Sequence, residues 1–170
     1  MARWINAVTT ITPTATADTA NLVNATFPML LQGGSTTQEV RIHEISISGQ
    51  AASSSSPTFM ILGRDSTVAA STSAAGTGQT NAALDPATVA LAAPPVTNNS
   101  NATAPQRSST LHLMNCSLNA FGGVYFWRAN KVDECVSVLG NAASLGEVSL
   151  SAFTGGTTGA IGVHLIFEPL

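Results

Sequence analysis

Apolar and polar residues alternate with a period of two along much of the chain, and the helical period of 3.6 is nearly absent. The alternation is clearest over residues 147–152 and 161–168, where every second residue is apolar. A strand with one face on a core has this pattern. Because Gly155 and Gly156 lie between the two segments, we expect a flexible turn there and pairing of the two segments as neighbouring strands.

The phase of the alternation slips at His43–Glu44. Val40 and Ile42 lie in one phase, and Ile45 and Ile47 lie in the other. A β-bulge at the slip would keep all four apolar side chains on one face of a single strand. The sequence therefore predicts a bulged strand through residues 40–47.

Two continuous apolar runs, 59–62 and 124–127, are typical of strands that are covered on both faces, by the core and by either a loop or a partner subunit. Further strands are expected at 3–11, 22–31, 109–118 and 135–139. The chain thus has about eight or nine short strands, which favours an all-β fold, an antiparallel two-sheet sandwich that is jelly-roll-like. No boundary or repeat divides residues 1–170, so a single β-sandwich domain is expected, with residues 1–12 as an N-terminal arm or edge strand.

Three segments rich in small polar residues and proline, 51–57, 66–83 and 93–106, predict long polar loops. Such loops are either disordered or ordered against adjacent subunits, and the sequence leaves both open. One helical turn is expected at 85–92, because Asp85 is a suitable N-cap and Pro86 fits the first helical position.

The amino-acid composition argues against several classes of function. Only 9% of the residues are charged, against about 25% in ordinary domains, so the surface suits a protein that packs against neighbours. The net charge is −3 and the six basic residues are scattered singly, which argues against nucleic-acid binding. No apolar stretch is long enough to span a membrane, and the opening residues do not resemble a signal peptide, so folding in the cytoplasm is expected.

No catalytic, cofactor-binding or metal-binding motif is present. His43, His112 and His164 have no second ligand at a spacing of two residues, and no Cys-x-x-Cys pair occurs. Cys116 and Cys135 lie among apolar residues and are expected to be buried, reduced thiols. We therefore expect no enzyme; an enzyme would need a pocket that gathers two carboxylates or a histidine with a nucleophile.

The aromatic residues give the candidate interface. Residues 125–127 are three consecutive rings, so alternation predicts core on one face of this strand and a subunit contact on the other. An exposed tryptophan is also suited to stacking on a sugar or to anchoring a subunit contact. The candidate interface residues are Trp4, Ile5, Tyr125 and Trp127.

Several segments of the sequence resemble segments of small virion proteins of tailed bacteriophages. They are RIHEISISGQAASSSSPT from Arg41, LGRDST from Leu62, NAFGG from Asn119, GNAAS from Gly140 and LSAFTGG from Leu150. The resemblance implies a head decoration (cement) protein, which is a β-rich subunit, often a homotrimer, bound to the major capsid protein on the capsid surface of the virion and made in the host cytoplasm. It brings no catalytic residue with it.

Two other classes stay open. One is a carbohydrate-binding or fibre-tip β-sandwich module, whose partner would be a glycan. The other is a jelly-roll capsid protein that forms the shell itself and would assemble into closed particles.

Overall fold

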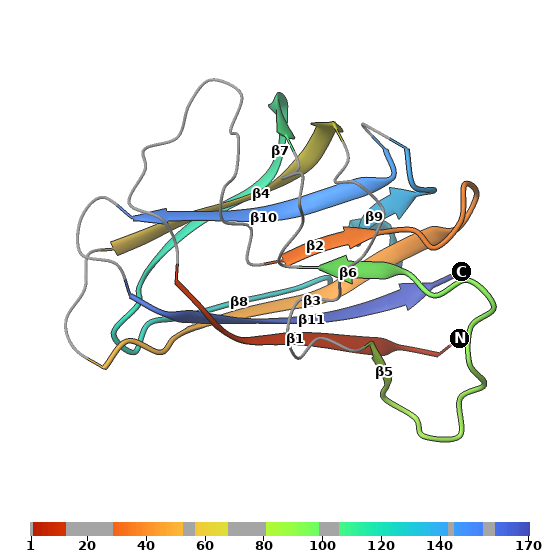
Figure 1. Cartoon of the computed structure of the whole chain (residues 1–170), viewed down its shortest axis with the longest axis horizontal. Helices are drawn as coiled ribbons and strands as arrows, with labels where there is room; N and C mark the ends of the chain where they lie inside the picture. Colours follow the sequence, from red (N-terminus) through yellow and green to blue (C-terminus); the bar gives the residue numbers. More distant parts are fainter. Residues whose placement is uncertain are drawn as a thin grey trace.

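Two antiparallel β-sheets make up the part of the chain that the structure describes (Figure 1). This computed structural model describes residues 2–12, 29–52, 57–67, 81–98, 106–142, 145–154 and 159–170. Sheet A has the order β5-β1-β11-β3-β8, with β9 also paired to β3, and sheet B has the order β6-β2-β10-β4-β7. The predicted all-β two-sheet sandwich is confirmed. The elements, in chain order, are β1 (Trp4–Ile11), β2 (Met29–Gln32), β3 (Glu39–Gly49), β4 (Pro57–Thr67), β5 (Ala82–Ala83), β6 (Val96–Asn98), β7 (Gln106–Asn119), β8 (Val124–Arg128), the 3₁₀ helix η1 (Val132–Glu134), β9 (Val136–Leu139), β10 (Glu147–Thr154) and β11 (Ile161–Pro169).

The chain winds around the sandwich as in a jelly roll. Without the short strands β5, β6 and β9, the order is β1-β11-β3-β8 in one sheet and β2-β10-β4-β7 in the other. Successive strands of this set lie in opposite sheets, except for β4 and β7, which pair with each other. This is the eight-stranded arrangement of a double-sheet jelly roll.

The expected pairing of residues 147–152 with residues 161–168 is wrong. β10 pairs with β2 and β4 in sheet B, whereas β11 pairs with β1 and β3 in sheet A. One-sided alternation specifies which face of a strand is buried and not which strand lies beside it. The two segments instead contribute apolar side chains to one core from opposite sheets.

The predicted β-bulge in β3 is confirmed. Glu44 pairs with Ile166 and Ile42 pairs with Phe167, so His43 is an extra residue opposite β11. The bulge resets the phase, and Val40, Ile42, Ile45 and Ile47 are all buried. Because His43 has no paired residue in β11, its side chain does not follow the regular alternation of β3, and its Nε2 lies 3.0 Å from Glu168 Oε2.

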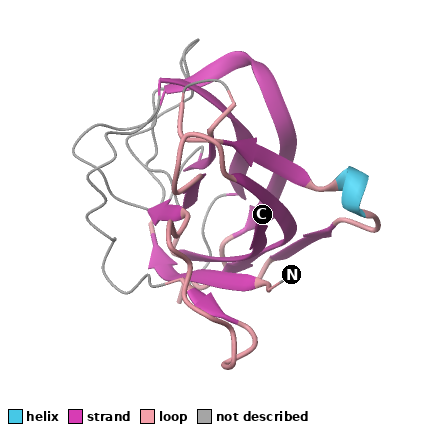
Figure 2. Ribbon diagram, turned by 90° about the vertical axis from the view of Figure 1, so that its right-hand side faces the viewer, coloured by secondary structure: helices cyan, strands magenta, loops and turns pink. Residues whose placement is uncertain are grey.

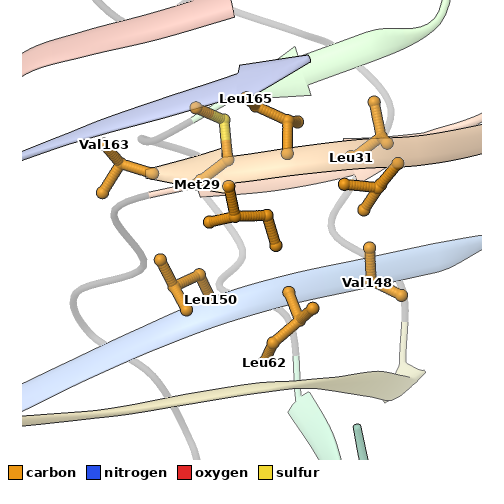
Figure 3. Close-up of a pocket in the computed structure, with 9 residues that line it drawn as sticks. Met29, Leu31, Leu62, Val148, Leu150, Val163 and Leu165 are labelled. Carbon is orange, nitrogen blue, oxygen red and sulfur yellow. The ribbon is translucent and has the colours of Figure 1, made fainter. Parts of the chain in front are cut away.

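The core lies between the two sheets and is formed by alternate residues of both. Figure 3 shows Met29, Leu31, Leu62, Leu150 and Val163, among others, pointing toward one another between the sheets. Burying each such side chain contributes about 1.5–3 kcal/mol. The gap that these side chains leave measures about 10 Å³ and its lining is apolar, so this part of the core has room for one water molecule at most and none for a ligand.

The outer faces of the two sheets differ. On sheet B, the outward-facing residues are as buried as the core; they are Leu30, Gln32, Ile61, Glu147, Ser149 and Ser151. On sheet A, the outward-facing residues are half-exposed, and many are small or polar; they include Ile5, Ala7, Ser46, Ser48, His164 and Ile166. Sheet A therefore carries the accessible broad face among the described residues.

Local structure outside the strands departs from the predictions in two places. The helical turn expected at 85–92 is absent: Asp85 Oδ1 accepts a hydrogen bond from the Ala87 amide at 2.9 Å and closes a turn instead. A short 3₁₀ helix, cyan in Figure 2, forms at Val132–Glu134, where none was predicted. Residues 68–80 and 99–105 of the predicted loops, and residues 22–28 of the strand predicted at 22–31, lie outside the described residues. The described parts of the loops predicted at 66–83 and 93–106 include the short strands β5 and β6, which were not predicted. No helix in the described ranges has the length and apolar character needed to cross a membrane.

Candidate functional site

The predicted interface residues occupy both faces of sheet A. Trp4, Tyr125 and Trp127 are half-buried and pack against the core, whereas Ile5 pairs with Ile166 on the outer face. Tyr125 lies opposite Ile47 of β3, which fixes the phase of β8. The other phase points outward, so Val124 is 74% exposed and Phe126 is 56% exposed.

The sandwich is open along one side, which we call the β7–β8 edge. β7 is the last strand of sheet B, β8 is at the corresponding end of sheet A, and the two strands contact each other. The chain passes between the sheets through Gly122, whose φ of 81° suits glycine. Core residues at this edge are only partly covered, and five further apolar side chains are exposed. The partly covered residues are Met114, Cys116, Tyr125 and Trp127, and the exposed ones are Leu111, Leu113, Phe121, Val124 and Phe126.

The β7–β8 edge is also free of charge. No Lys, Arg, Asp or Glu occurs from Ser108 to Trp127. Soluble proteins commonly protect edge strands with charged side chains, especially lysine. Neither strand of this edge has that protection along these residues.

The opposite side, which we call the β1–β6 edge, is closed by hydrogen bonds. Asn6 of β1 is 1% exposed, and its Nδ2 donates to Asn81 Oδ1 at 3.0 Å and to Thr97 Oγ1 at 2.8 Å. The Thr97 hydroxyl donates to Asn81 Oδ1 at 2.6 Å, and Asn81 Nδ2 donates to the Pro95 carbonyl at 2.7 Å. Because Thr97 belongs to β6, this network links the edge of sheet A to the edge of sheet B.

A cluster of reactive side chains surrounds the bulge in β3. His43 is 8% exposed, and its Nε2 lies 3.0 Å from Glu168 Oε2 on β11. Its Nδ1 lies 3.5 Å from the Sγ of Cys135, the residue between η1 and β9. The bulge thus places one imidazole between a carboxylate and a thiol, and bulges often re-aim a side chain next to a functional site.

The two cysteines are unpaired and half-buried, in agreement with reduced thiols but less enclosed than predicted. Burial raises the pKa of the Cys116 thiol from 9.0 to about 11. Burial also raises the pKa of the Cys135 thiol, with nearby Arg41 acting in the opposite direction. Both thiols are therefore protonated at neutral pH in the resting protein.

A cleft of about 320 Å³ lies beside the bulge. Its lining consists of Arg3, His43, Arg128, Ala129 and Asn130. Arg128 Nε lies 3.9 Å from Glu44 Oε2, which is a weak surface ion pair. Among the described residues, Arg3 has no carboxylate within ion-pair distance. The cleft is therefore polar and carries positive charge.

Sequence reasoning did not find this cluster. Cys135 is 92 residues from His43, and Glu168 is 125 residues from it, so no spacing rule connects them. The one available signal was the phase slip at His43–Glu44, which marked the bulge but not its neighbours. Within the described ranges, no three His, Cys, Asp or Glu side chains are grouped so as to hold a metal ion.

Searches for similar proteins found no match: no protein-family model and no curated protein sequence matches the chain.

Proposed function

We propose that this chain is a non-enzymatic virion structural protein that decorates and stabilises the capsid of a tailed bacteriophage through subunit–subunit contacts. Its partners are the major capsid protein and copies of itself. The observation that supports this proposal is the β7–β8 edge, an uncharged and apolar side of the sandwich where core aromatic rings are incompletely covered.

An edge of this kind suits a contact that is buried in the working assembly. Monomeric proteins rarely expose large contiguous apolar patches, and such patches mark interaction sites. Interface centres are depleted in charge and enriched in aromatic residues, which matches Phe121, Tyr125, Phe126 and Trp127. The half-buried state of Tyr125 and Trp127 leaves apolar area for a partner to cover.

The outer face of sheet A supplies a surface to receive this edge from a second copy. A shallow depression of about 210 Å³ lies there, and Ala7, Ser46, Ser48 and Gly162 are among the residues that line it. These side chains are small, Gln50 and His164 also line the depression, and none of the lining residues is Lys, Arg, Asp or Glu. A neighbouring apolar edge can therefore approach without burying one of these charges. Contact between two different surfaces of identical chains closes into a ring when the rotation permits, and a homotrimer is such a ring.

A trimer of this kind would stabilise a shell by mass action. A protein that binds only the assembled capsid shifts the equilibrium toward that state, and three linked copies bind more tightly than one. The low content of charged residues is compatible with a protein that spends its life among neighbouring subunits.

The test is the solution mass of the purified chain by light scattering after size exclusion, for the wild type and for Phe126→Lys and Val89→Lys. Phe126 is on the β7–β8 edge, whereas Val89 is an equally apolar residue outside it and is 84% exposed. We expect a trimer for the wild type and for V89K, and for F126K a monomer that keeps the far-UV circular dichroism spectrum of the wild type.

A wild-type monomer at all concentrations would contradict the proposal, and binding on a glycan array would then favour the carbohydrate-binding alternative. Closed particles in the electron microscope would instead identify a shell-forming capsid subunit.

A further inference from the structure

The cluster at the bulge has the parts of a base-assisted nucleophile. Cys135 supplies a thiol, His43 a base within 3.5 Å of its sulfur, and Glu168 a carboxylate within 3.0 Å of the other ring nitrogen. A nucleophile in contact with a base, and the base oriented by a third group, is the arrangement that activates weak nucleophiles in proteins. The three side chains come from three elements, the η1–β9 junction, β3 and β11.

The hydrogen bonds select one tautomer of His43. A carboxylate accepts hydrogen bonds and does not donate them, so Glu168 requires the proton of neutral His43 to be on Nε2. Nδ1 then carries the lone pair, and that lone pair faces the thiol of Cys135. The imidazole is thus already oriented to accept the S–H proton.

The environment of Cys135 allows a reagent to reach it. The residue is partly exposed, and its thiol also lies 3.7 Å from the Lys131 carbonyl, which can accept the S–H hydrogen bond at rest. His43 belongs both to this cluster and to the lining of the positively charged cleft. A reagent with a negative group in the cleft would therefore bring its other end to the ring of His43.

We propose that Cys135 accepts an acyl group from a small acyl donor with an anionic leaving group, with His43 as general base and Glu168 as the positioning residue. Arg3 and Arg128 bind the anionic group of the donor. This inference is independent of the proposed structural function.

The chemistry balances without a co-reactant. As sulfur attacks the carbonyl carbon, the S–H proton moves to His43 Nδ1, a C–S bond forms and the bond from carbon to the leaving oxygen breaks. His43 then returns the proton to the leaving group or to solvent, and Glu168 remains a carboxylate throughout. The products are a thioester on Cys135 and the free leaving group.

The experiment measures acetylation of each cysteine by peptide mass spectrometry, with two donors of the same acetyl group. Acetyl phosphate is negatively charged when it binds, whereas 4-nitrophenyl acetate is uncharged until its leaving group departs as a phenolate. Cys116 is the internal reference, in the wild type and in the Phe126→Lys protein, whose β7–β8 edge is not covered by another copy. It is half-buried and has no histidine bonded to its sulfur among the described contacts. We expect Cys135 to react at least about tenfold faster than Cys116 at neutral pH, since general-base assistance contributes 10²–10⁴-fold in enzymes.

Variants separate the roles. His43→Gln should slow acetylation of Cys135 by about 10²-fold with both donors. The matched control His164→Gln removes another histidine of sheet A, one that contacts Ser46, and should leave the rate unchanged. Arg3→Gln alters an exposed side chain and should slow the reaction with acetyl phosphate only.

Glu168→Gln should slow acetylation at neutral pH, and this loss should shrink as the pH rises above the raised pKa of the Cys135 thiol, where the sulfur ionises without a base. A purely structural role would lower the rates at neutral and at high pH alike, or neither. If a variant unfolds, Cys116 becomes reactive as well, which identifies the artefact, and the folded Arg3→Gln protein still tests the cleft. Equal rates for Cys135 and Cys116 in the wild type, or for wild type and His43→Gln, would overturn the proposal.

Discussion

At each side of the sandwich, the edges of the two sheets meet and the core between them must be covered. The two sides differ in how it is covered. At the β1–β6 edge, Asn6, Asn81 and Thr97 join the two sheets through side-chain hydrogen bonds, and Asn6 is sealed from solvent. At the β7–β8 edge, the rings of Tyr125 and Trp127 are only partly covered, and apolar side chains point outward around them. A buried polar network completes an edge within one chain, whereas a bare apolar edge is suited to a contact with another molecule.

This difference separates the edge whose side chains hold the fold together from the edge whose side chains are suited to contact another molecule. The hydrogen bonds of this network favour one arrangement of the two sheets, because each donor requires its acceptor at the right distance, although the buried Oδ1 of Asn6 accepts none among the described contacts. An apolar surface requires only a complementary surface. The β1–β6 edge is thus suited to stability, and the β7–β8 edge is suited to association.

The largest effect is expected from opening the closed edge. Asn6→Ala removes a buried hydrogen bond to Thr97 of the other sheet and a partly buried one to Asn81, and we expect the free energy of unfolding to fall by about 1–3 kcal/mol. The matched control is Asn115→Ala, the same substitution at an exposed residue of β7, which should change stability by less than about 0.5 kcal/mol. Urea unfolding of the three proteins measures both, and equal losses would remove the distinction between the edges.

A smaller effect is expected from the thiol at the open edge. The folded pKa of Cys116, about 11, lies above its unfolded value of 9.0, so the unfolded chain loses its proton first as the pH rises. The corresponding stability is present below about pH 9 and is lost between pH 9 and 11. Because the residue is half-exposed, we expect a loss of about 1 kcal/mol or less.

The measurement is the unfolding free energy of wild type and Cys116→Ala at about pH 8 and about pH 10.5. The other titrating groups are the same in both proteins, so the difference isolates Cys116. The alkaline loss should be smaller in the variant; a loss of the same size in both would show that this thiol is not linked to folding.

The smallest effect is expected at the ion pair that ends β8. Glu44→Gln removes the partner of Arg128 at 3.9 Å, where the arginine is largely exposed. Exposed pairs contribute about 0–1 kcal/mol, so we expect a change below about 0.5 kcal/mol in urea unfolding and no change in solution mass. A change of solution mass would indicate that the copies associate through the charged end of β8 at Arg128 and not through the apolar β7–β8 edge.

The sequence predicted which residues form strands, and which face of a strand is buried, better than it predicted which strands lie side by side. The phase slip located the bulge at His43, because the identity of each residue records which face is buried. The pattern in residues 124–127 was ambiguous, since all four residues are apolar and either phase fits. The structure resolves it by placing Tyr125 toward the core and Phe126 toward solvent.

Long-range partners had no local signal. β10 and β11 alternate in the same manner, yet they belong to different sheets. Asn6 is 91 residues from Thr97, and Cys135 is 92 residues from His43, so neither the closed edge nor the thiol cluster is visible in any window of sequence. These sites exist only because the jelly-roll path brings distant strands together.

The most direct test of the central claim is amide hydrogen exchange of the wild type and of Phe126→Lys, compared strand by strand. If the β7–β8 edge is covered by another copy, the amides of β7 and β8 will exchange more slowly in the wild type than in the variant. Those of β2 and β6 will exchange equally in both, because these strands of sheet B belong neither to the open edge nor to the receiving face of sheet A. Equal exchange of β7 and β8 in the two proteins would contradict the account and show that the open edge stands free in solution.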